Sequence, residues 1–153
     1  MTRRLIGALA IITTLLLSGC GNDYGVDQYG QKVAAERLDK QWLVVNYWAE
    51  WCGPCRTEIP ELNALAEQLK AQNVGVFGVN FDNVQGEELK AASDKLGIKF
   101  TVLAQNPDGI FDIPRSEALP VTYIIDDKGK VREQLMGEQT AEGVLAKLKA
   151  LRG

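Results

Sequence analysis

The feature that most constrains the fold is a pair of cysteines placed between an apolar run and a helical pattern. Residues 43–48 form a continuous run rich in β-favouring side chains, which predicts a strand buried at the centre of a sheet. The tetrapeptide Cys52-Gly53-Pro54-Cys55 follows this run, and Pro54 suits the first turn of a helix, where no N–H donor is needed. We therefore expect Cys52 where a strand ends and a helix begins.

A cysteine at the start of a helix is well placed for thiolate chemistry. The N–H groups of the first turn lack partners within the helix, and together with the helix dipole they favour an anion. An ordinary thiol is only about 3% ionised at pH 7, whereas one with a pKa near 7 is about half ionised. That difference corresponds to about 2 kcal/mol, which a helix terminus and local hydrogen bonds can supply. The sequence therefore predicts that Cys52 exchanges disulfides.

The N-terminus has the pattern of an export signal. Arg3 and Arg4 form a positive start, residues 5–17 form an apolar run, and Leu17-Ser18-Gly19-Cys20 closes it. The run is too short to span a bilayer comfortably as a mature helix. Its closing tetrapeptide resembles a bacterial lipobox, in which residues 1–19 are removed and Cys20 is acylated, so that lipid chains hold the protein to a membrane. The alternative is an ordinary cleaved signal in which Cys20 carries no lipid.

Composition narrows the class of protein. The 153 residues are 46% hydrophobic with a net charge of −3, which fits one globular domain and argues against a nucleic-acid partner. The chain has no histidine, so the usual general base and the commonest metal ligand are absent. If Cys20 carries lipid, Cys52 and Cys55 are the remaining cysteines, in a compartment outside the cytoplasm where disulfides persist.

The rest of the chain alternates strand and helix patterns. We expect a short tether at residues 20–23, then a turn at 27–32 that leads into a small hairpin or strand through residue 38. A helix after Cys52 has apolar residues on one face and a kink expected at Pro60. The further expected elements are a strand at 74–80, a helix at 87–96 ended by Gly97, a strand at 100–104, a loop with one short helix, a hairpin of strands at 121–125 and 130–136, and a last helix capped by Thr140. This order predicts an α/β fold with a mixed central sheet and helices on both faces.

Two motifs carry a resemblance to a known family. They are residues 46–55, Asn-Tyr-Trp-Ala-Glu-Trp-Cys-Gly-Pro-Cys, and residues 119–126, Leu-Pro-Val-Thr-Tyr-Ile-Ile-Asp. With the element order, they resemble the thioredoxin fold and are most similar to the membrane-tethered, extracytoplasmic thiol-disulfide reductases of the TlpA/ResA group. The resemblance covers one domain at residues 24–153, and residues 87–104 resemble the helix-strand insertion of that group.

The resemblance implies roles for individual residues. Cys52 would be the nucleophile, with an exposed sulfur, and Cys55 would resolve the mixed disulfide. Pro120 would be a cis-proline facing the cysteines, leaving the Leu119 backbone free to pair with an extended substrate. The substrate face would also include Trp51, Gly53 and Pro54.

One departure from plain thioredoxins concerns the proton acceptor. Those proteins have a buried Asp six residues before the first cysteine, whereas this chain has Asn46. The TlpA/ResA group instead has a Glu three residues after the second cysteine, and Glu58 matches it. Glu58 would take the proton of Cys55, with burial raising its pKa. The alternative is a solvated glutamate that only favours the helix dipole.

Several functions remain open at this point. The resemblance implies a reductase of oxidised exported proteins, apocytochrome c among them, which is kept reduced by a membrane electron donor. A thiol oxidase or isomerase of the same fold, and a non-catalytic docking lipoprotein, are the alternatives. Gly-Pro between the cysteines is the thioredoxin pair and favours reduction. A related peroxidase is disfavoured because Cys52 lacks a Thr-x-x-Cys context, and a zinc site is disfavoured because four ligands are not available.

The expected setting follows from the same features. We expect a monomer without metal or cofactor, anchored through Cys20 on the periplasmic face of a bacterial membrane. Gly21 after the lipid-bearing cysteine leaves the choice between inner and outer membrane open.

Overall fold

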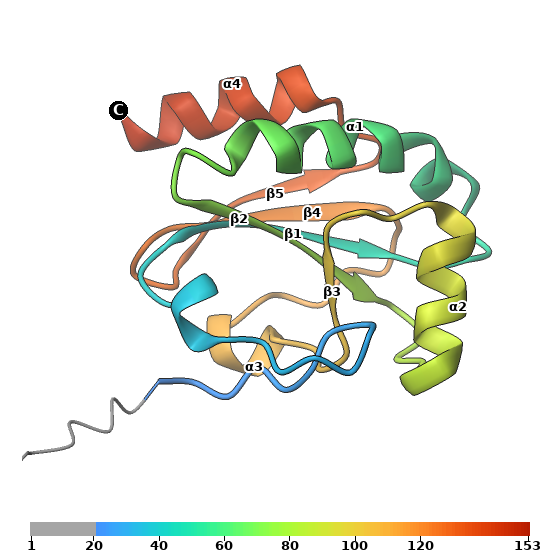
Figure 1. Ribbon diagram of the computed structural model, residues 1–153. Helices are drawn as coiled ribbons and strands as arrows, with labels where there is room; N and C mark the ends of the chain where they lie inside the picture. Colours follow the sequence, from blue (N-terminus) through green and yellow to red (C-terminus); the bar gives the residue numbers. More distant parts are fainter. Residues whose placement is uncertain (1–20) are drawn as a thin grey trace, which may run out of the picture.

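The computed structural model describes residues 21–153 and shows a single five-stranded sheet with strand order β3-β2-β1-β4-β5 (Figure 1). The predicted signal peptide and the predicted lipid site at Cys20 lie outside the described residues. The central strand β1 is parallel to β2 and antiparallel to β4, so the sheet is mixed, as predicted. The strands are β1 Trp42–Trp48, β2 Val74–Asn80, β3 Thr101–Leu103, β4 Val121–Ile125 and β5 Val131–Met136.

The helices follow the predicted order. They are η1 Ala35–Arg37, a short 3₁₀ turn, and the α-helices α1 Gly53–Leu69, α2 Gly86–Leu96, α3 Asp108–Phe111 and α4 Ala141–Arg152. Gly97 ends α2 in the left-handed region at φ 68°, which a glycine adopts without strain. Thr140 caps α4 by accepting a hydrogen bond from the Gly143 N–H at 3.1 Å. In residues 21–153 no helix is both long and apolar enough to cross a bilayer.

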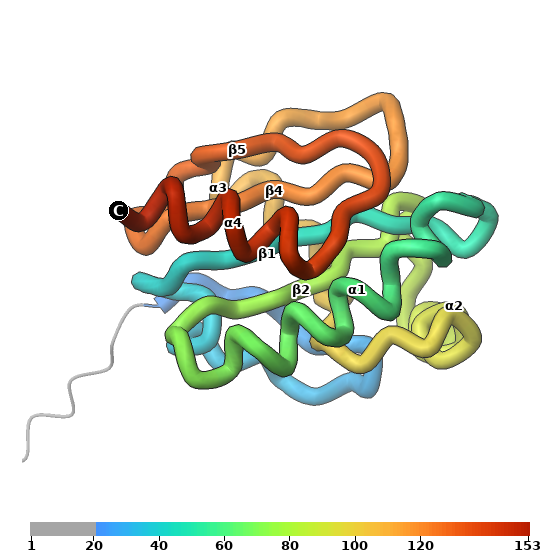
Figure 2. The backbone as a smooth tube through the Cα atoms, turned by 90° about the horizontal axis from the view of Figure 1, so that it is seen from above, coloured from blue at the N-terminus to red at the C-terminus, as the bar shows by residue number. Residues whose placement is uncertain are grey.

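One face of the sheet is covered by the long helices. Helices α1 and α4 lie side by side over this face, with α2 next to the β3 edge (Figures 1 and 2). The apolar residues of α1 that the 3.6-residue period predicted are buried at Ile59, Leu62, Leu65 and Leu69, and they pack in one cluster with Val44 and Trp48 of β1. Leu89 of α2 and Val144 of α4 join the same cluster.

The opposite face is covered by α3 and the N-terminal segment, which confirms the prediction of helices on both faces. Tyr24, Val33 and Leu38 pack there with Phe111 and the other side of the strands. A hairpin-like bridge joins Val26 and Lys32, as predicted, but the chain after it is a 3₁₀ turn and not a strand. This turn lets Val33 and Leu38 both reach the sheet, which a straight strand leaving the hairpin would not allow.

The strand register brings several chain segments to one end of the sheet. Trp48 at the end of β1 pairs with Asn80 at the end of β2, and Tyr47 pairs with Val121 at the start of β4. The beginning of α1, the loop after β2 and the loop before β4 therefore meet at this end, which we call the disulfide end.

Candidate active site

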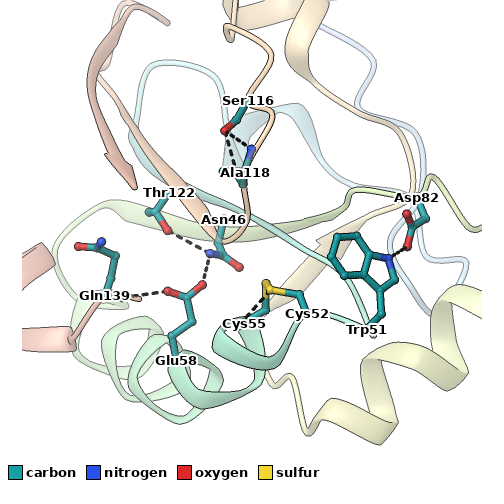
Figure 3. Close-up of a disulfide and its surroundings, with 10 residues drawn as sticks. All are labelled: Asn46, Trp51, Cys52, Cys55, Glu58, Asp82, Ser116, Ala118, Thr122 and Gln139. Carbon is teal, nitrogen blue, oxygen red and sulfur yellow. Dashed lines mark hydrogen bonds between the residues drawn. A yellow bond between two sulfur atoms is a disulfide. The ribbon is translucent and has the colours of Figure 1, made fainter. Parts of the chain in front are cut away.

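The two cysteines lie where the sequence predicted them. Cys52 is the N-cap residue of α1, its sulfur accepts a hydrogen bond from the Cys55 N–H at 3.2 Å, and the two residues form a disulfide (Figure 3). The N–H that points at the sulfur is one of those left without a partner in the first helical turn. The same donor favours negative charge on the Cys52 sulfur once the disulfide is reduced.

The cysteines are more covered than predicted. Cys52 is only 4% exposed and Cys55 is fully buried, so the expectation of an exposed Cys52 sulfur is wrong as stated. The reason is that Cys52 packs into the cluster of Trp48 and Ala49, against which Leu119 also lies. The order of access still distinguishes the two sulfurs, because Cys52 alone keeps contact with solvent.

Trp51 forms the exposed rim of the site together with Gly53 and Pro54. Its side chain is 63% exposed, yet the indole N–H donates a hydrogen bond to Asp82 Oδ2 at 2.8 Å (Figure 3). This bond fixes a large apolar surface beside Cys52. We did not predict Asp82 from the sequence. The available signal was its place just after β2, which ends at the disulfide end.

The loop before β4 lies beside the disulfide. The Leu119–Pro120 peptide bond is cis, as predicted. Ser116 Oγ holds the loop by accepting from the Ala118 N–H and donating to the Ala118 carbonyl (Figure 3). Pro120 accepts from Gly137, whereas among the described residues the N–H and C=O of Leu119 make no hydrogen bond. The backbone of Leu119 is thus open to a second chain.

Glu58 is a buried acid on the same helix as the cysteines. It is 1% exposed, so the alternative of a solvated first-turn glutamate is wrong. Its Oε1 accepts from Asn46 Nδ2 at 2.6 Å and its Oε2 from the Gln139 N–H at 3.0 Å. Burial raises the pKa of Glu58 to about 7, against the opposing effect of these two hydrogen bonds. Near neutral pH it therefore exists in comparable amounts with and without its proton.

The residues that hold Glu58 come from distant parts of the chain. Asn46 Nδ2 also donates to Thr122 Oγ1 at 3.0 Å, because the two residues pair across β1 and β4 with side chains on the same face. From the sequence, Asn46 was expected only as the residue that replaces an acid, and Thr122 and Gln139 were not predicted. The signal available for Thr122 was that Asn46 and Thr122 are polar residues within β1 and β4, two strands that are otherwise largely apolar.

The arrangement has a definite chemical capacity. It combines a disulfide at a helix start, a buried acid with a pKa near neutrality three residues beyond Cys55 on that helix, and the unpaired Leu119 backbone on the cluster that contains the cysteines. These are the parts needed to form and resolve a mixed disulfide. Within residues 21–153 there is no group of three His, Cys, Asp or Glu side chains placed to hold a metal ion.

Comparison with known proteins gives a consistent result. Residues 16–134 match the AhpC/TSA family. The thiol-disulfide oxidoreductase ResA of Bacillus thuringiensis (strain Al Hakam) is 31% identical over 125 residues, which cover 82% of this chain and 72% of that protein. The thioredoxin-like protein YneN of Bacillus subtilis (strain 168) is 30% identical over 121 residues, 78% of this chain and 70% of that one. A thiol:disulfide interchange protein of the thioredoxin family from Chlorobium tepidum TLS has a crystal structure that superimposes with a TM-score of 0.69 at 25% identity, covering 84% and 92% of the two chains.

Proposed function

Because the chain belongs to the AhpC/TSA family and is a thioredoxin-like thiol-disulfide oxidoreductase of the ResA kind, we propose that it reduces disulfides in exported proteins. The observation that carries the proposal is the buried Glu58, whose raised pKa suits it to take the proton of a resolving thiol. A docking module without catalysis would have no use for such an acid, which costs stability wherever it is ionised.

The reaction begins with the reduced cysteines. The Cys52 thiolate attacks one sulfur of the substrate disulfide, a bond forms between them, and the other substrate sulfur leaves as a thiolate. Cys55 then gives its proton to Glu58, and its thiolate attacks the Cys52 sulfur. The bond from Cys52 to the substrate breaks and the second substrate thiolate leaves. Two electrons have passed to the substrate, and the Cys52–Cys55 disulfide seen in the structure is the product.

Substrate recognition is proposed to rest on backbone pairing and one apolar surface. The unpaired N–H and C=O of Leu119, placed by Pro120, would bind an extended segment beside the substrate disulfide. Trp51, Gly53 and Pro54 would contact that segment from the other side of Cys52. Backbone pairing makes few demands on sequence, which suits a protein acting on several exported substrates, apocytochrome c among them.

The cellular setting is part of the proposal. The pattern of residues 1–19 supports export, and Cys20 after the lipobox-like sequence supports a lipid anchor on the outer side of a bacterial membrane. There the Cys52–Cys55 disulfide would be reduced again by a membrane electron donor, since extracytoplasmic conditions do not keep thiols reduced.

Reduction of insulin in the presence of dithiothreitol tests the activity. The wild-type protein should accelerate the precipitation of the insulin B chain, and Cys52→Ser should abolish the acceleration. Cys55→Ser, reduced beforehand and mixed with insulin after the dithiothreitol has been removed, should instead accumulate a mixed disulfide with insulin, visible on a non-reducing gel. No acceleration by the wild-type protein would contradict the proposal.

The direction of electron flow is tested in cells. Alkylation after acid quenching should find Cys52 and Cys55 mostly as thiols in the growing bacterium. A pair found mostly as a disulfide would favour the oxidase of the same fold.

A further inference from the structure

Asn46 has a buried oxygen without a partner. The residue is fully buried, and Asn46 Oδ1 is one of two buried side-chain polar atoms in residues 21–153 that make no hydrogen bond. The other is Trp48 Nε1, which lies against Gly78, the residue of β2 that pairs with Asn46 in the sheet. No hydrogen bond joins these two atoms in the structure. Buried polar groups in native proteins are paired in the great majority of cases, so Asn46 Oδ1 needs an explanation.

The hydrogen bonds of Asn46 fix the direction of this oxygen. Both hydrogens of Nδ2 are used, one on Glu58 Oε1 and one on Thr122 Oγ1. In Figure 3 the amide group lies between the Glu58 carboxylate and the disulfide, and its oxygen is on the side of Cys55. In the disulfide Cys55 has no hydrogen to donate. A thiol at Cys55 would supply the missing donor.

We propose that Asn46 is a positioning residue for proton transfer between Cys55 and Glu58, with its amide oxygen accepting a hydrogen bond from the Cys55 thiol. This inference rests on the proposed function, because it assigns a residue to the step in which Cys55 resolves the mixed disulfide. Before that step, Glu58 is ionised and accepts from Nδ2, while the Cys55 S–H donates to Oδ1.

After the proton moves, the same amide satisfies both new partners by turning over. Protonated Glu58 needs an acceptor and the Cys55 thiolate needs a donor, and the turned amide offers its oxygen to Glu58 and its N–H to Cys55. The Thr122 hydroxyl stays paired in both arrangements, since it can accept from Nδ2 or donate to Oδ1. An aspartate at position 46 would only accept when ionised and would place a second negative charge beside Glu58.

The step can be measured apart from the first attack. The reduced protein releases one coloured thionitrobenzoate when Cys52 attacks Ellman's reagent and a second when Cys55 resolves the mixed disulfide. Asn46→Leu, which keeps the volume and removes the amide, should slow the second release relative to the first by about 10- to 100-fold, the effect of a lost hydrogen bond to a charged group. It should also move the pH dependence of the second release upward, because Glu58 loses its N–H donor.

Thr122 provides a matched pair of variants in case Asn46→Leu does not fold. Thr122→Val keeps the shape and removes the hydroxyl, and it should slow the second release by about threefold to tenfold. Thr122→Ser restores the hydroxyl and should restore the rate. If the Thr122 hydroxyl has only a structural role, Thr122→Val should lower the stability of the protein without moving the pH dependence of the second release.

Glu58→Gln separates this inference from the proposed function. If Glu58→Gln slows the second release while Asn46→Leu and Thr122→Val match the wild type in rate and pH dependence, the role of Asn46 is refuted and that of Glu58 stands. If Glu58→Gln itself has no effect on that release, the proposed proton acceptor is wrong, and the role of Asn46 is overturned with it.

Discussion

Two buried carboxylates lie at opposite ends of the sheet and meet opposite surroundings. Glu58 lies at the disulfide end, and Asp126 follows β4 at the other end, where the hairpin to β5 begins. They are 1% and 6% exposed. Glu58 accepts from one side-chain amide and one backbone N–H. Asp126 accepts from the Lys128 and Lys130 N–H groups and from the Arg132 guanidinium.

The difference in donors decides what each acid does. Burial raises the pKa of both groups, but at Asp126 the hydrogen bonds from Lys130, Lys128 and Arg132 outweigh it and leave the pKa below its ordinary value. At Glu58 burial prevails and the pKa rises to about 7. Asp126 is therefore a permanent anion that organises a turn, whereas Glu58 holds a proton that it can exchange near neutral pH. Two carboxylates with little exposed surface thus act as a structural group in one place and as a proton-exchanging group in the other.

The largest expected effect is on stability against pH. Folding raises the pKa of Glu58 from 4.5 to about 7, so the folded state keeps a proton that the unfolded state loses between these values. Stability from this group is present below pH 4.5 and is lost as pH rises through 7, in total about 3 kcal/mol. Urea unfolding of the disulfide form at about pH 5 and pH 8 should show this decline, and Glu58→Gln should remove it. A decline of equal size in both proteins would assign it to other groups.

The next effect is on activity, and it contrasts the two acids directly. Glu58→Gln should slow insulin reduction about 100-fold near neutral pH, because Cys55 loses its proton acceptor. Asp126→Asn should leave the rate as in the wild type, since Asp126 is at the far end of the sheet. The two rates, measured on proteins matched for folded fraction, should also differ in their pH profiles. If both variants slowed insulin reduction equally, the loss of rate would come from a general loss of stability and not from the loss of a proton acceptor.

Asp126→Asn should instead reduce stability at neutral pH by about 2 kcal/mol, the value of hydrogen bonds to a charged acceptor. The pKa of Asp126 is lowered on folding, so its contribution is present above the ordinary value of 3.8 and is lost as pH falls through the lower folded value. The unfolding free energies of wild type and variant should therefore converge in acid. A constant difference at all pH values would show that charge on Asp126 has no part in it.

Much of the fold was predictable because its signals are local. The apolar run before Cys52, the proline in the first turn and the glycine after α2 each act within a few residues, and the structure confirms the elements that they predicted. The N-terminal segment was predicted less well, because its 3₁₀ turn depends on Val33 and Leu38 packing under the sheet, which no local pattern encodes.

The sequence was enough to name candidate site residues, but it did not predict which residues surround them. Glu58 was identified through a resemblance, but its hydrogen bonds come from Asn46, twelve positions before it, and from Gln139, eighty-one positions after it. The hydrogen bond from Trp51 to Asp82 likewise joins loops after two different strands. Such contacts follow from strand order and register, which a sequence pattern leaves open.

The smallest expected effect distinguishes the donors of Asp126 from one another. Arg132 Nη1 lies 3.2 Å from Asp126 Oδ2, but the arginine side chain is 40% exposed, and ion pairs open to water contribute about 0.5 kcal/mol. Arg132→Leu should therefore cost much less stability than Asp126→Asn, because the Lys128 and Lys130 N–H groups remain on Oδ1. The stability loss caused by Arg132→Leu should shrink further in high salt, because salt screens an exposed pair and leaves backbone hydrogen bonds unaffected. Chemical unfolding of the two variants at low and high salt measures it. If Arg132→Leu costs as much as Asp126→Asn, the guanidinium holds the anion at this end of the sheet, and the contrast with Glu58 is one of charge and not of the number of donors.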